Sequence, residues 1–515
     1  MPAQILLNLS VLVFGSVLIF PFSSRMNTSL YVALAWFCGW ATIVIVEISL
    51  IIAGVYVTMP KIAGYSAFCV IMLWIAARNS IMERMVFRRR ELRRFFWQFA
   101  ILLLLCVLVI VLLDYFGTYI WYSGDSVHID GLSRTFHKYG VYGDAKQYSI
   151  NQISVGLHSL FVDRMPFYVA IHSVAYLCGI EVFYSFMGAT TFFTCLALWG
   201  FWKGENDQFG FVSLIWLLLV LALFLSNRMV VLHSFYTLTN LTTMAYYTLG
   251  ILSLYEYLNK KDYLWFMLAC LFLSCTGILR IEMLGFSLLP FCFVGWKKCL
   301  PKFEILLLGF GLYFLVSYSW FCWGFLGLLG ISEAIALGFW GWYRSFLVVA
   351  VGFLLSLIIF FFPWQTTNKR VRIAIYMLLF ISALFFICYF NNKLMTSWNF
   401  IYLLTAKGGG NWGSFWRLLF LGVCIYALLR ILPVLFKILP GEIKVPLMTD
   451  KKGLDFLAFV ATAFFITIIV LCCKSGFDAA GAAWYCGANR MLLHICPVSV
   501  YFLGRIGFIC TREIT

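Results

Sequence analysis

Long apolar runs, separated by short polar loops, follow one another along almost the whole of this chain. An α-helix needs roughly 20 apolar residues to cross the hydrocarbon core of a bilayer, and most of the runs approach that length. Of the 515 residues, 63% are hydrophobic and only 11% are charged, a composition that excludes an ordinary soluble domain. The sequence therefore predicts an all-α polytopic membrane protein with about 15 transmembrane helices.

The positive charge of the chain is scattered over the short loops between these runs. The formal net charge is +16 at pH 7, but binding of nucleic acid needs basic residues gathered on one solvated face, so no nucleic-acid partner is expected. The densest basic cluster lies between Glu83 and Arg94, as is typical of a cytoplasmic loop. With this loop inside, the later basic clusters also fall inside: Lys260-Lys261, Lys297-Lys298, Lys369 to Arg372 and Lys437 to Lys452. The same alternation predicts an outer N-terminus and a cytoplasmic C-terminus.

A polar stretch from Asp114 to Glu181 interrupts the apolar runs, and the alternation of helices places it on the outer face. Within it, Asp125 follows Gly124, which allows the backbone to turn sharply. A carboxylate there can accept the proton of an attacking sugar hydroxyl, so Asp125 is a candidate general base. The alternative is an ordinary solvated loop aspartate. The segment from Arg164 to Cys178 is too short to span the membrane, and we predict an interfacial amphipathic helix there.

The same stretch holds residues of the types that bind divalent metals. His128, Asp130 and His137 are candidate ligands, and Asp125 could join them. Their spacing matches no strong metal signature, and hydrogen-bonded loop residues are the alternative. A divalent metal is therefore a possible cofactor, and no other cofactor is expected.

Further charged residues lie at the predicted outer ends of apolar runs. Arg280 and Glu282 form either a structural ion pair between two helices or a site at which Arg280 binds a phosphate. Arg490 begins the last apolar run, and its alternatives are an anion contact or an interfacial anchor. His494, one helical turn further, would share the face of Arg490. Glu47 lies inside the second run, and we interpret it as a helix-packing contact.

From Phe96 onward, the order of these elements resembles the GT-C class of membrane glycosyltransferases that use polyprenyl-phosphate sugars. This class includes protein O-mannosyltransferases, lipid A aminoarabinose transferases and bacterial O-antigen glucosyltransferases. Four segments carry the resemblance, in chain order: the outer-loop motif Gly124 to Gly140, the entry Arg164-Met-Pro166-Phe-Tyr168, the hairpin Gly277 to Pro290, and Asn489-Arg490 to Pro497. Many members carry a second acid directly after the first, whereas this chain has Ser126 there, and Asp130 is the candidate substitute.

The resemblance implies a function and a set of site residues. Asp125 would be the catalytic base, and the departing lipid phosphate would be held by Arg280, Arg490 or Arg164. Asp130, Tyr168, Glu282 and His494 would complete the substrate-binding site. The implied reaction transfers a sugar from a polyprenyl-phosphate donor to a glycan or lipid acceptor, such as O-antigen or lipopolysaccharide.

The resemblance also divides the chain. Residues 1–80 would form an N-terminal module of three membrane helices, and residues 96–515 a GT-C-like domain with its catalytic outer loop at 114–181. The protein would lie among the lipids of the bacterial inner membrane, with its active site facing the periplasm. Two other functions remain open at this stage, an O-antigen polymerase and a transporter or flippase for a lipid-linked sugar.

Overall fold

The computed structural model describes residues 2–76, 166–181, 183–205, 210–235, 239–280, 283–296, 299–323, 418–427, 451–475 and 491–514, with a few isolated positions between them. Within these ranges the chain is helical almost throughout and contains no β-strand. The prediction of an all-α protein is therefore confirmed for the part of the chain that the structure describes.

The N-terminal helices pack closely on one another. Helix α1 (Pro2–Ile19) continues into a 3₁₀ helix (Phe20–Arg25), and α2 (Thr28–Ile52) and α3 (Met59–Ala76) follow. The crossing of α1 and α2 depends on two glycines, because a Cβ at Gly15 would overlap the carbonyl oxygen of Ala35 and one at Gly39 would lie 2.6 Å from that of Val11. The backbones can approach this closely only where side chains are absent.

Helix α2 also packs against helices that follow the predicted N-terminal module. Its partners include α8 (Pro166–Leu177) and α9 (Ser185–Glu205). Trp36 stacks on Phe193 at 4.8 Å, and a Cβ at Gly200 would lie 2.6 Å from Leu30. Helix α2 therefore joins the two predicted parts of the chain.

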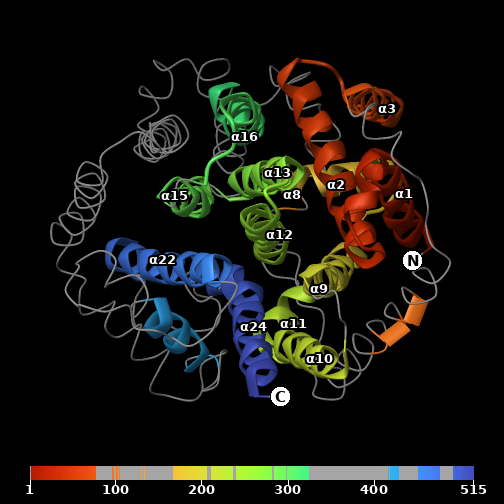
Figure 1. The fold of residues 1–515 in the computed structure, drawn as a ribbon. Coiled ribbons are helices and arrows are strands. Elements are labelled where there is room, and N and C mark those ends of the chain that lie inside the picture. Colours follow the sequence, from red (N-terminus) through yellow and green to blue (C-terminus); the bar gives the residue numbers. More distant parts are fainter. Residues whose placement is uncertain are drawn as a thin grey trace.

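Helices α12 (Thr239–Lys260) and α13 (Tyr263–Leu279) lie in the middle of the bundle, as Figure 1 shows. Every residue of α12 from Thr239 to Leu258 is buried, although its sequence contains many Thr, Ser and Tyr residues. The helices that surround this pair include α9, α15 (Leu289–Trp296), α16 (Phe303–Trp323), α22 (Lys451–Ser475) and α24 (Cys496–Ile514). The residues at the two ends of α12 therefore lie at the centre of the two ends of the bundle.

Two apolar runs are broken rather than straight. Helix α10 (Phe211–Ser226) and the short α11 (Arg228–Ser234) meet at Asn227 at an angle of 67°. The run that begins at Met283 forms α14 (Met283–Phe286) and then α15, where Pro290 occupies the second position and lacks the N–H that a continuous helix would use. Such breaks change the direction of the chain.

Five of the described helices are long and apolar enough to cross a membrane, or six if the bent pair α10 and α11 is one span. These helices support a membrane protein. The prediction of about 15 spans includes apolar runs outside the described residues, so the described helices do not confirm it.

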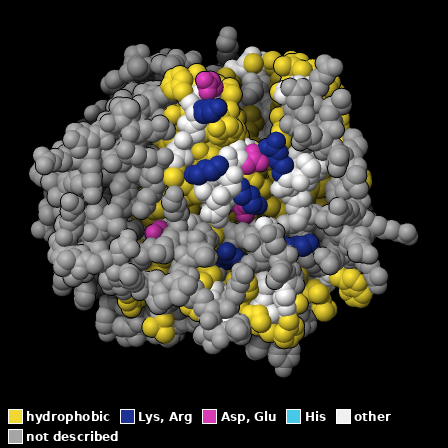
Figure 2. Space-filling view, viewed as in Figure 1, with side chains coloured by type: hydrophobic (Ala, Val, Ile, Leu, Met, Phe, Trp, Pro, Cys, Tyr) yellow, Lys and Arg dark blue, Asp and Glu magenta, His cyan; other side chains and the backbone are white. Residues whose placement is uncertain are grey.

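Hydrogen bonds and ion pairs assign the helix termini to two ends of the bundle. At one end, which we call the Arg25 end, Arg25 Nη1 lies 2.7 Å from Asp262 Oδ1, and Asn27 Nδ2 donates to the Gly200 carbonyl at 2.6 Å. The opposite end, which we call the Arg280 end, contains the first turn of α12 and the last turn of α13. Figure 2 shows one face of the molecule, on which basic and acidic side chains lie next to one another.

Candidate functional site

Arg280 is held at the C-terminus of α13. Its backbone leaves the helix in an extended conformation, with φ −151° and ψ 132°, and its N–H donates to the Thr276 carbonyl. The guanidinium Nη1 donates to Asn240 Oδ1 at 2.6 Å. Asn240 is buried in the first turn of α12, so the central helix orients the guanidinium. The amide is neutral, and this bond therefore orients the positive charge without neutralising it.

His494 lies within electrostatic range of Arg280 and of a second histidine, His233. His494 is in a short 3₁₀ helix, η7 (Leu493–Ile495), which packs on α12 and precedes α24. His233 lies on α11. We call Arg280, Asn240, His233 and His494 the Arg280 cluster.

The histidines of the cluster are fully enclosed. His494 is buried, with the ring of Phe464 set edge-on at 6.0 Å, and neither of its ring nitrogens has a hydrogen-bond partner among the described residues. His233 is buried as well, and its Nδ1 lies 2.8 Å from the Met229 carbonyl oxygen. A buried imidazole whose nitrogens make no hydrogen bond destabilises the fold unless a ligand supplies the missing bonds.

The bend between α10 and α11 brings His233 to this position. Asn227 forms the break, and its side chain accepts hydrogen bonds from the N–H groups of Met229 at 2.8 Å and Val230 at 3.3 Å. These bonds satisfy the first free N–H groups of α11. Thr191 and Ser234, whose hydroxyls lie 2.6 Å apart, attach α11 to α9. The sequence pattern alone does not single out His233 or Asn240.

The described members of the cluster are hydrogen-bond donors or can become so. A guanidinium, two imidazoles and an amide suit an anion with several oxygens, such as a phosphate. Guanidinium groups bind phosphate oxygens in pairs, which gives orientation as well as attraction. The arrangement can therefore hold an anionic group at the end of an apolar bundle.

Tyr168 lies in a neighbouring group of side chains rather than in the Arg280 cluster. It is fully buried on α8, its ring contacts His172 at 4.7 Å and Phe186 at 6.0 Å, and its hydroxyl has no hydrogen-bond partner among the described residues. Helix α8 forms where a short helix was predicted. The predicted interfacial position of this helix is wrong, because residues Pro166 to Ala175 are all buried and α2 and α13 both pack against it.

The other residues proposed for the site lie outside the described residues. These are the catalytic candidate Asp125, the binding candidates Asp130, Arg164, Glu282 and Arg490, and the metal candidates His128 and His137. Of the predicted site residues, Arg280 and His494 come together, and Tyr168 lies beside another part of the same bundle.

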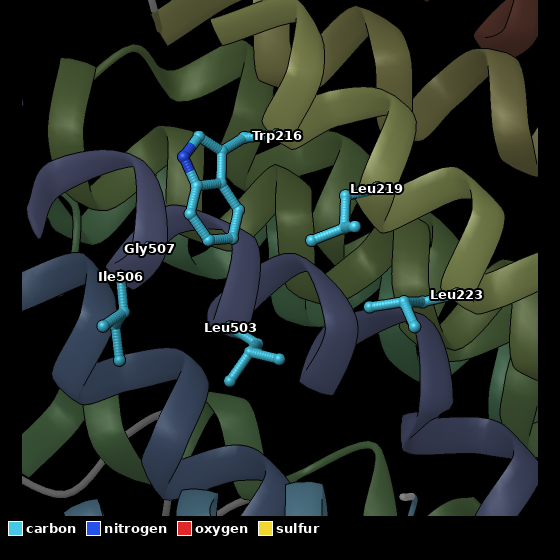
Figure 3. A pocket seen from close by; sticks show the side chains of 6 residues that line it. All are labelled: Trp216, Leu219, Leu223, Leu503, Ile506 and Gly507. Atoms are coloured by element: carbon cyan, nitrogen blue, oxygen red, sulfur yellow. The ribbon is translucent and has the colours of Figure 1, made fainter. Parts of the chain in front are cut away.

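An apolar groove of about 410 Å³ lies between α10 and α24. Figure 3 shows the residues that line it: Trp216, Leu219, Leu223, Leu503, Ile506 and Gly507. Gly507 opens the groove, because a Cβ at that position would overlap the ring of Trp216. Both helices of the groove are adjacent in the chain to elements of the Arg280 cluster. Helix α10 directly precedes the helix of His233, and α24 directly follows that of His494. At 1.5 Å per residue, Leu223 lies about 6 Å along the helix from Asn227.

Comparisons with protein-family models, with curated proteins and with solved structures found no match to this chain. The chemistry of the site therefore rests on its own residues and geometry.

Proposed function

We propose that this protein is a polytopic glycosyltransferase of the bacterial inner membrane. It transfers a sugar from a polyprenyl-phosphate donor to a glycan or lipid acceptor on the periplasmic side, as in the modification of O-antigen or lipopolysaccharide. The single observation that carries the proposal is the convergence of Arg280, His233 and His494 at one end of an apolar helical bundle. A cationic site at the end of membrane helices suits a lipid with an anionic head.

The donor has two chemically distinct parts, and the molecule offers a place for each. Its phosphate binds at the Arg280 cluster, where Arg280 supplies paired N–H groups. Its hydrocarbon tail lies in the groove between α10 and α24, whose lining residues are all apolar. The two places are connected along the chain by α11 and η7, so one amphiphile can occupy both.

The proposed reaction is a direct displacement at the anomeric carbon. Asp125 takes the proton of the acceptor hydroxyl, and the oxygen attacks the sugar carbon while the bond from that carbon to the phosphate oxygen breaks. The polyprenyl phosphate leaves with the bonding electron pair, and the anomeric configuration inverts. Arg280, with Arg490 or Arg164, stabilises the negative charge that grows on the phosphate.

The proposal includes a topology. About 15 spans, an outer N-terminus and a cytoplasmic C-terminus place loop 114–181 and the Arg280 end on the periplasmic side. Arg25 and Asp262 meet at the end of the bundle opposite to Arg280, which supports the alternation of these helices in the proposed topology. A divalent metal, if one is used, would be held by Asp125, His128, Asp130 and His137, and no step of the proposed reaction depends on it.

The activity is tested with purified protein in liposomes, a polyprenyl-phosphate hexose and an isolated lipopolysaccharide acceptor. Asp125→Asn should abolish transfer while expression and membrane insertion stay normal. Full activity of this variant would overturn the assignment of Asp125. Mass spectrometry of the envelope glycan with and without the protein identifies the sugar that is transferred.

The groove offers a matched pair of variants on one helix. Leu219 and Ile215 lie one turn apart on α10, with 44% and 48% of their surfaces exposed, but only Leu219 lines the groove. Leu219→Trp should weaken binding of a long polyprenyl phosphate by about tenfold, because it fills space that the tail needs. Ile215→Trp should leave the dissociation constant unchanged. Equal effects of the two substitutions would contradict the placement of the tail.

A second candidate function is transport of a lipid-linked sugar. The break of 67° between α10 and α11, and the break between α14 and α15, are the observations that favour it, because transporters bind substrates at interrupted helices. A reconstituted flipping assay without acceptor separates the two classes. Movement of the lipid-linked sugar across the bilayer without glycosyl transfer would favour transport.

A further inference from the structure

Glu47 is a buried acid for which the proposed function has no use. It lies on α2, five residues before the helix ends at Ile52, and it is completely buried. Neither of its carboxyl oxygens has a hydrogen-bond partner of ordinary geometry among the described residues. Intramembrane acids usually have a partner or a function, so this carboxyl requires an explanation.

In the part of the chain that the structure describes, a neutral hydroxyl group lies next to Glu47. The hydroxyl of Ser173, on α8, lies beside the carboxyl. The other titratable groups on this part of α8 are Tyr168, His172 and Tyr176. The ring of Phe186 lies beside Tyr168, and that of Phe183 beside His172.

The basic groups on the other helices packed against α2 are directed elsewhere. Lys61, on α3, is exposed and donates to the Tyr56 carbonyl at 2.8 Å. Lys203 lies in the last turn of α9 and Glu304 in the first turn of α16, both at the Arg25 end. None of these charged groups is a partner for Glu47.

A second buried glutamate provides the comparison. Glu256, on α12, has only 1% of its side chain exposed, but Lys260 Nζ lies 2.6 Å from its Oε2. An ionised carboxyl in a dry interior is very costly without such a partner, and the group takes up a proton instead. Glu256 has the ammonium group that stabilises its charge, and Glu47 does not.

We propose that Glu47 is a proton-binding site that fastens α8 to α2. In the packed state the carboxyl holds a proton and shares it with the Ser173 hydroxyl. Loss of the proton to water leaves a carboxylate, which must be hydrated, and α8 separates from α2 to admit water. The packed state binds the proton and the separated state releases it, so packing of α8 is stable at low pH and weakens as pH rises.

This site has a route to the Arg280 end. Helix α8 packs against α13, the helix that ends at Arg280, and Phe167 contacts Tyr246 of α12 with ring centroids 5.1 Å apart. Separation of α8 from α2 therefore removes a support from both helices that orient Arg280. The proposal does not depend on the function given above, because its tests measure the proton and the helix rather than glycosyl transfer.

The first test is chemical and needs no variant. A hydrophobic carbodiimide reacts with protonated carboxyl groups in a membrane, and the products are located by mass spectrometry of the full-length protein in liposomes. We expect labelling at Glu47 that falls as pH rises, and no labelling at Glu256 in the same sample. Absence of a label at Glu47, equal labelling of both residues, or protection of Glu47 by sodium ions rather than by high pH would overturn the proposal.

The second test follows α8 itself. Glu47→Gln keeps the shape of the side chain but cannot lose a proton. Hydrogen exchange of residues 166 to 177 is compared between the wild type and this variant at each pH, which removes the intrinsic dependence of exchange on pH. The wild type should lose protection relative to Glu47→Gln as pH rises, and Glu256→Gln should behave like the wild type. An identical pH profile of the wild type and Glu47→Gln would contradict the proposal.

Discussion

The two ends of the helical bundle treat charge in different ways. At the Arg25 end, Asp262 is paired with Arg25, and the buried Glu256 is paired with Lys260. At the Arg280 end, Arg280 donates to the neutral Asn240, and His494 and Glu47 have neither a hydrogen bond nor an ion pair among the described residues. Paired charges are sufficient to hold helices together. Buried polar groups that lack hydrogen-bond or ion-pair partners indicate sites at which a ligand or a proton binds.

The largest effect is expected from removing the same residue type at each end. Arg280→Ala should lower the rate of sugar transfer by about 10²- to 10³-fold, because it removes a cation that stabilises the leaving phosphate. Arg25→Ala, measured in the same liposome assay, should leave the rate unchanged. Arg280→Lys should recover only part of the activity, because an ammonium group cannot form the paired hydrogen bonds of a guanidinium. Equal losses in Arg280→Ala and Arg25→Ala would remove the functional distinction between the ends.

An intermediate effect is expected from breaking the buried pair at the Arg25 end. Lys260→Ala removes the ammonium group beside the buried Glu256 carboxyl, and we expect the free energy of unfolding to fall by about 2 kcal/mol. The double variant with Glu256→Gln should recover most of this lost stability, since the buried negative charge is gone. Thermal unfolding of the purified proteins in detergent measures the stability of the single and the double variant. If the single variant is as stable as the wild type, Glu256 does not depend on Lys260 and the contrast with Glu47 is lost.

The smallest effect is expected from the exposed pair. Arg25 and Asp262 have 41% and 27% of their side chains exposed, and a pair in that setting contributes at most about 1 kcal/mol. Arg25→Ala should therefore lower the unfolding temperature slightly at low salt, and high salt should reduce the difference from the wild type. A large fall in unfolding temperature that does not depend on salt would show that Arg25 stabilises this end by something other than an exposed ion pair.

Several features of the fold follow directly from local sequence. Helices form where apolar runs were predicted, and the short segment after Arg164 forms a helix of the expected length. The break in the run after Met283 has a local cause in Pro290, which lacks the N–H that a continuous helix would use. Burial on both faces of α8 could not be predicted, because it depends on the helices from elsewhere in the chain that cover it.

Part of the candidate site was also accessible from sequence. Arg280 and His494 stand out because charged and ionisable residues are rare in apolar runs. Asn240 and His233 do not stand out, because their roles come from a hydrogen bond across two helices and from a bend at Asn227. Glu47 was interpreted as a packing contact, and only the tertiary structure reveals that its carboxyl has no charged partner in the described part of the chain.

The sequence by itself determined that this chain is helical and apolar enough for a membrane, because hydrophobic runs and scattered loop charges act locally. The tertiary structure alone decided which polar groups meet and which remain without partners. It joined His233, Arg280 and His494 around the first turn of α12, and it gave Glu256 a lysine while leaving Glu47 with a serine hydroxyl. The physical reason is that the free energy of a buried charge depends on its neighbours in space, and helices distant in sequence supply those neighbours.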